Sequence, residues 1–119
     1  MTKDEIQTRV DAWLEKRRES GWFHLQAGRC ALWEQWNNVS QRYGADSPST
    51  LGVLEHGLIP ASGYGQDAHL DCWPGPCGEF RWTLVYRAEP VHLGQCFSVD
   101  EDGHPSKAEA LVVALEAAP

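Results

Sequence analysis

Residues 80–87 read Phe-Arg-Trp-Thr-Leu-Val-Tyr-Arg and alternate between large apolar and mostly polar side chains. Alternation with period two places Phe80, Trp82, Leu84 and Tyr86 on one face of a β-strand. A second alternating stretch follows at residues 91–99, and the sequence predicts a short strand at residues 69–73. Such alternation is typical of an antiparallel sheet with one covered side, so we expect a small sheet of about three strands.

Two helices are expected before this sheet. Thr2 and Glu5 form a capping box, in which each side chain can satisfy a free backbone donor at the start of a helix. The apolar residues that follow at helical spacing are Ile6, Val10, Trp13 and Leu14. A second periodic stretch covers about residues 25–43, and a short helix is expected at residues 51–56.

A further helix is expected after the sheet. Ser106 and Glu109 form another capping box, and its predicted buried stripe comprises Ala108, Leu111, Val112 and Leu115. Residues 60–68 are rich in glycine and indicate a surface loop. The order of two helices, a small antiparallel sheet and a C-terminal helix predicts an α+β fold, with one domain spanning residues 1–119.

The charge of the chain is distributed unevenly. The formal net charge is −7, with +1 over residues 1–45 and −8 over residues 46–119. An acidic half repels phosphates of nucleic acids and membranes, and it attracts a basic partner. None of the 5 histidines lies in a recognisable nucleophile motif. We therefore expect a protein that binds and is not an enzyme.

The sequence also bears on the cellular compartment. No stretch has the length and apolar character of the ~18 residues that a membrane span needs. Asp4 and Glu5 occupy positions where a secretory signal peptide would have a basic start. We therefore expect a cytoplasmic protein with its cysteines reduced.

Cys72, Cys77, His92 and Cys96 are the best candidates for a metal site, because short spacing within each pair suits tetrahedral zinc. Against this interpretation, His92 and Cys96 fall on an expected strand, where residues four apart are about 13 Å from end to end. A disulfide between Cys72 and Cys77 is a second alternative. Free cysteines buried as small hydrophobic side chains are the third and favoured one, so we expect no cofactor.

Carboxylates of the acidic half are the candidate contacts to a partner. They are Asp67, Asp71, Glu79, Glu89, Asp100, Glu101 and Asp102. Tyr64 and Trp73 are expected to lie in exposed loops and to serve as aromatic anchors beside them. The alternative is that each carboxylate only keeps a small domain in solution.

The C-terminal third resembles the strand–strand–helix ending of small phage and prophage α+β sandwich proteins. The resemblance covers residues 82–118 and includes Phe97-x-Val99-Asp100-x-Asp102-Gly103, followed by Ser106-x-x-Glu109-Ala110-Leu111 and Ala114-Leu115. It implies an inhibitor from a phage or mobile element, in the class that includes anti-CRISPR proteins, acting in a bacterial host cell. No catalytic residues are carried over.

Three functions remain open from the sequence. The favoured one is a non-enzymatic inhibitor whose acidic surface occupies a basic, nucleic-acid-binding surface of a host defence complex such as CRISPR–Cas. The second is a zinc-binding module or small metalloenzyme built on the cysteines and His92. The third is an immunity protein against a toxic nuclease. In the favoured case the partner is a protein, without direct contact to nucleic acid or membrane, and the chain is a monomer or a dimer.

Overall fold

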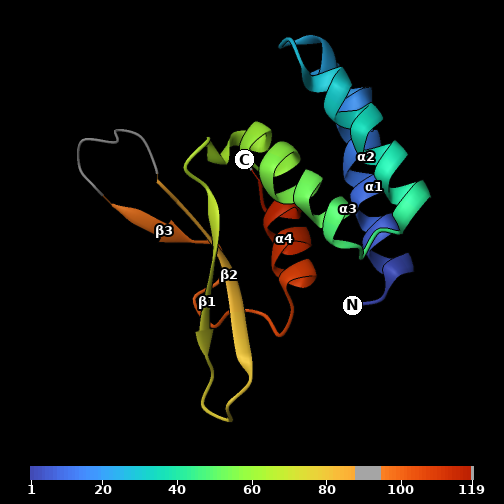
Figure 1. The fold of residues 1–119 in the computed structure, drawn as a ribbon. Helices are drawn as coiled ribbons and strands as arrows, with labels where there is room; N and C mark the ends of the chain where they lie inside the picture. The colour runs from blue at the N-terminus through green and yellow to red at the C-terminus, as the bar shows by residue number, and fades with distance from the viewer. Residues whose placement is uncertain (88–94, 119) are drawn as a thin grey trace.

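The computed structural model describes residues 1–87 and 95–118 and has a mixed α+β fold, which confirms the predicted fold class. Figure 1 shows the helices α1–α3 packed on one side of α4, and the sheet on the other side. The helices are α1 (Lys3–Glu19), α2 (Arg29–Tyr43), α3 (Pro48–Val53) and α4 (Lys107–Glu116), and the strands are β1 (His69–Pro74), β2 (Phe80–Arg87) and β3 (Cys96–Ser98). Shorter helical turns cover Trp22–His24, Leu54–Leu58 and Pro60–Tyr64.

The described strands form an antiparallel sheet in the order β1-β2-β3, with β2 in the centre. Leu70 of β1 lies opposite Leu84, and Phe97 of β3 lies opposite Tyr86. The strands predicted at residues 69–73 and 80–87 are thus confirmed. Of the strand predicted at residues 91–99, the part at residues 96–98 is confirmed, while residues 88–94 lie outside the described part of the chain.

Helix α4 lies between the sheet and α1, and it contacts both. Six of its 10 residues are buried, namely Ala108, Ala110, Leu111, Val112, Ala114 and Leu115. Leu84 of β2 is 1% exposed and belongs to the same apolar core as Val10 of α1. On the outside of the contact between α1 and α4, Arg9 donates two hydrogen bonds to the carboxylate of Glu116.

The N-terminal helices differ from the prediction at one boundary. The capping box of Thr2 and Glu5 is present at the start of α1, as predicted. Helix α2 begins at Arg29 and not near Leu25, because Gly28 adopts a φ of +91° that does not continue a helix. Leu25 instead follows the short turn at residues 22–24 and is 76% exposed. In the described part of the chain, no helix has the length and apolar character to cross a membrane.

Two predictions between α2 and the sheet are corrected. The short helix starts at Pro48 and not at Leu51, because the Ser47 hydroxyl accepts a hydrogen bond from the Thr50 amide and caps it. Helical turns then continue into the first half of the expected loop at residues 60–68, with a kink at Gly63, whose φ is +122°.

Tyr64 was expected in an exposed loop but is only 6% exposed. Its hydroxyl donates a 2.6 Å hydrogen bond to the backbone carbonyl of Ala114, near the end of α4. Its ring packs edge-on against Tyr86, with ring centres 4.8 Å apart. The last carbonyls of a helix lack partners within the helix, so this hydroxyl satisfies a group that burial would otherwise leave unpaired.

We expect Leu111→Ala to lower the free energy of unfolding by about 2–5 kcal/mol, because it opens a cavity at the centre of α4. Val113→Ala in the same helix is the control, since Val113 is only partly buried and should change stability by less than about 1 kcal/mol. Urea denaturation followed by tryptophan fluorescence measures both. Equal losses for the two variants would contradict the central place of α4.

Stability should also depend on Tyr64 in alkaline solution. Burial raises the pKa of the Tyr64 hydroxyl from 10.0 to about 12, so the folded state holds this proton more tightly than the unfolded chain does. Its stabilisation is complete below pH 10 and is lost as the pH rises towards 12. Urea midpoints measured across this range should fall less steeply for Tyr64→Phe than for the unchanged protein. Equal slopes for the two proteins would contradict a contribution of the buried Tyr64 hydroxyl.

Candidate binding surface on the outer face of the sheet

The acidic turn, which we define as Asp100, Glu101, Asp102 and Gly103, follows β3 and lies along the edge of the central strand β2. The Val99 amide donates to the Leu84 carbonyl, and His104 exchanges two backbone hydrogen bonds with Trp82. Between these two attachments, the Asp100 amide donates to the Thr83 hydroxyl. The turn is therefore anchored to β2 on both sides.

Arg81 holds the same turn from the outer face of the sheet, which we define as the face opposite α4. Its guanidinium donates to the carbonyl of Asp102 at 3.2 Å and to that of Gly103 at 2.8 Å. Gly103 has a φ of +73°, and a Cβ atom there would lie 2.9 Å from the Trp73 ring. The guanidinium of Arg81 is thus bound to the acidic turn. The Trp73 ring packs directly against Gly103 of the same turn.

These contacts create an open hollow of about 360 Å³ on the outer face. Alternation along the strands explains its composition, since Asp71 lies opposite Thr83 and Trp73 lies opposite Arg81. The residues that line this outer-face hollow are Asp71, Trp73, Thr83, Val85, Cys96, Phe97, Ser98 and Glu101. Two carboxylates and the Trp73 ring, from β1 and from the acidic turn, therefore meet on one surface.

The structure thus brings together three of the predicted contact residues, Asp71, Trp73 and Glu101. Trp73 lies on β1 and is partly buried, so its predicted place in an exposed loop is wrong. Tyr64, being buried, belongs to the core and is no anchor. Phe97 of β3 is 42% exposed, but it lies opposite Tyr86 with ring centres 5.9 Å apart, so its ring belongs to the other face of the sheet.

The remaining predicted carboxylates lie apart from the outer-face hollow. Asp67, Glu79 and Asp102 are exposed but do not line it. Asp100 is half-buried, and one of its carboxylate oxygens accepts a hydrogen bond from the Asp102 amide. Its other oxygen lies 3.2 Å from Nε2 of His104, so Asp100 mainly holds the turn. Glu89 lies outside the described residues.

The cysteines are exposed and free, which corrects the expectation that they are buried. Cys72 pairs with Trp82 on one edge of β2, and Cys96 pairs with Arg87 on the other edge. Cys72 and Cys96 are therefore two strand spacings of about 4.8 Å apart across the sheet. They are also five residues of about 3.3 Å apart along β2, so they cannot ligate the same ion. His92 lies outside the described residues. Within residues 1–87 and 95–118, no three His, Cys, Asp or Glu side chains are grouped to hold a metal.

Comparison with known proteins adds no function to this surface. No protein-family model matches the sequence, and neither the curated proteins nor the solved structures give a match. The function is therefore argued from the residues of this chain alone.

The packing of Trp73 on the acidic turn can be tested with two glycine variants. Gly78→Ala introduces a Cβ at a φ of +85° with no neighbouring atom within 4 Å, so it should destabilise the protein by about 1 kcal/mol. Gly103→Ala adds a clash with Trp73 to the same backbone penalty and should lower the free energy of unfolding by about 2–4 kcal/mol. Thermal unfolding measures the difference. Equal effects would show that Trp73 does not pack on the turn.

Proposed function

We propose that this chain is a small acidic binding protein whose outer-face hollow receives a basic surface of a partner protein. The observation that carries the proposal is the meeting of Asp71, Glu101 and Trp73 around one open hollow. Aromatic side chains supply most of the binding energy in many interfaces, and carboxylates beside them select basic partners.

The charge around the hollow supports a cationic partner. Arg81, on the same face of the sheet, donates its hydrogen bonds to backbone carbonyls of the acidic turn. Among the described residues, no cation lines the hollow itself, so Asp71 and Glu101 can attract a positive charge from outside. The net charge of the whole chain is −7, so it is negative like the two carboxylates. A negative chain would encounter a basic partner faster.

The order of the surface also supports binding. The acidic turn is attached to β2 through the backbone of Val99 and His104, and Arg81 holds it from the side. A surface that is already ordered loses less conformational entropy when the partner binds. This favours a specific contact over a carboxylate surface that serves only solubility.

An inhibitor of a nucleic-acid-handling protein is the partner relationship that fits this chemistry best. Arginine and lysine side chains that bind phosphates also bind carboxylates, so an ordered acidic surface competes for a nucleic-acid-binding channel. An anti-CRISPR inhibitor of a host complex and an immunity protein against a toxic nuclease would both act by this competition. The identity of the captured partner distinguishes them.

The test compares two double variants with the same change of charge. Asp71→Lys with Glu101→Lys alters the outer-face hollow, while Glu19→Lys with Glu34→Lys alters exposed positions on α1 and α2. Tagged proteins are used to capture partners from bacterial lysate at roughly 50 mM and about 500 mM salt, with mass spectrometry as the readout. We expect the first variant to bind the captured partner at least about tenfold more weakly and the second to bind it normally.

Two further results are expected of the true partner. Added nucleic acid should displace the chain, and high salt should weaken the complex, because both compete for the same basic surface. Capture that is identical for the unchanged protein and the Asp71→Lys, Glu101→Lys variant would refute the proposed function.

A further inference from the structure

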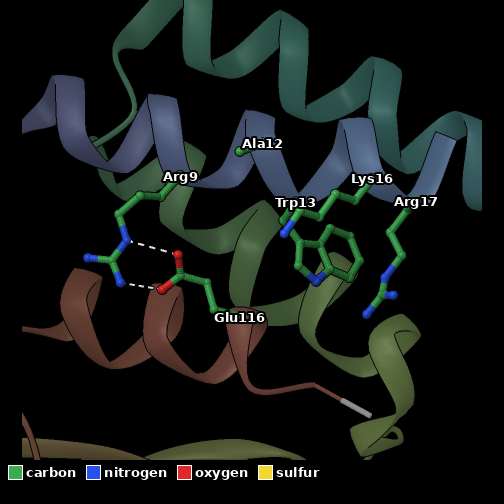
Figure 2. Close-up of a pocket in the computed structure, with 6 residues that line it drawn as sticks. All are labelled: Arg9, Ala12, Trp13, Lys16, Arg17 and Glu116. Atoms are coloured by element: carbon green, nitrogen blue, oxygen red, sulfur yellow. Dashed lines mark hydrogen bonds and ion pairs between the residues drawn. The ribbon is translucent and has the colours of Figure 1, made fainter. Parts of the chain in front are cut away.

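A second hollow, of about 300 Å³, lies between α1 and the C-terminal end of α4, on the side of α4 that faces away from the sheet (Figures 1 and 2). Its lining residues are Arg9, Ala12, Trp13, Lys16, Arg17 and Glu116. Arg9, Trp13 and Arg17 are spaced four residues apart on α1, which places them along one face of the helix. We call this site the basic hollow, because it has three cations and one carboxylate.

The basic hollow contains a buried donor without an acceptor. Trp13 is 7% exposed, and its indole Nε1–H is buried with no hydrogen-bond partner among the described residues. The indole ring is held in place by Trp22, which packs edge-on with ring centres 5.4 Å apart. Buried polar groups are rarely left unpaired in folded proteins, so this N–H indicates a missing acceptor.

The positive charge beside Trp13 is also only partly neutralised. Arg9 is occupied by its two hydrogen bonds to Glu116, which Figure 2 marks with dashed lines. Arg17 lies over the indole ring, with its guanidinium carbon 4.7 Å from the ring centre, and its buried Nε–H has no acceptor in the described part of the chain. Neither Lys16 nor Arg17 has a carboxylate within 4.0 Å there.

The position of these cations has a simpler partial explanation. Lysine and arginine in the last turn of a helix compensate the negative end of its dipole, and Lys16, Arg17 and Arg18 all lie in the last turn of α1. Arg18 in addition pairs with Glu15. The helix dipole explains why Lys16 and Arg17 lie at the end of α1. It does not explain the Trp13 N–H, because no carbonyl of that last turn accepts a hydrogen bond from it.

We propose that the basic hollow binds one phosphoryl group, either inorganic phosphate or a small phosphate monoester. A phosphate dianion matches the two positive charges of Lys16 and Arg17, and its oxygens can accept from a guanidinium and from the indole N–H together. A volume of about 300 Å³ is at the lower end for small-ligand sites, which favours a small molecule. Two charges are too few to hold a run of nucleic-acid phosphates.

The experiment is a titration of the whole ¹⁵N-labelled protein with inorganic phosphate, followed through the indole N–H signals in ¹H–¹⁵N spectra. Trp13 and Trp22 contact each other, and only Trp22 of the two also packs on Phe23, so ring contacts assign the Trp13 signal without a tryptophan variant. We expect this signal to shift and saturate with a Kd on the order of 1 mM. A parallel titration with glycerol phosphate distinguishes the two candidate ligands. Tighter binding of glycerol phosphate than of inorganic phosphate would identify a monoester as the ligand, and equal binding would identify the free ion.

Variants test whether the binding is specific. Lys16→Gln and Arg17→Gln should each raise the Kd about tenfold, whereas Arg18→Gln should leave it unchanged although it removes the same charge from the neighbouring position. Sodium chloride at equal ionic strength is the solvent control. A Trp13 signal that moves no more with phosphate than with chloride would overturn the proposal, and so would an equal loss of affinity in Arg18→Gln and Arg17→Gln.

Discussion

Burial of α4 on two opposite sides is the constraint on which the rest of the structure depends. One side contacts the sheet and the other contacts α1, so a single helix of 10 residues joins both layers of the fold. Leu111 and Leu115 are completely buried as a result. Tyr64 adds a hydrogen bond to the carbonyl of Ala114, and Arg9 pairs with Glu116, so polar contacts fix the helix where it leaves the core.

This central helix also separates two surfaces of opposite charge. The outer-face hollow has Asp71 and Glu101 in its lining, whereas the basic hollow has Lys16 and Arg17. Each charged group faces solvent on its own side of α4, and apolar side chains fill the space between them. A small domain can in this way present an acidic and a basic surface without the two neutralising each other, because α4 and the apolar core lie between them.

Patterns between neighbouring residues predicted the helices and strands well, but they predicted poorly which side chains are buried. The capping residues Thr2 and Ser106 act within three positions of the chain, so sequence spacing was enough to predict where α1 and α4 begin. Tyr64 was misplaced because its burial depends on α4, 50 residues further along the chain. The glycines near Tyr64 indicated a loop, whereas tertiary packing holds residues 60–64 in helical turns.

The sequence by itself determined the fold class, the alternation of β2, the capped helices and the acidic character of the second half. These properties depend on neighbours within one turn or one strand, or on composition alone. Only the tertiary structure decided which carboxylates act together. Asp71 and Glu101 are 30 positions apart, and they share a hollow because β1 pairs with β2 while the bonds of Arg81 and Thr83 hold the acidic turn against the same strand. Strand pairing of this kind is a long-range contact, and spacing along a single chain does not specify it.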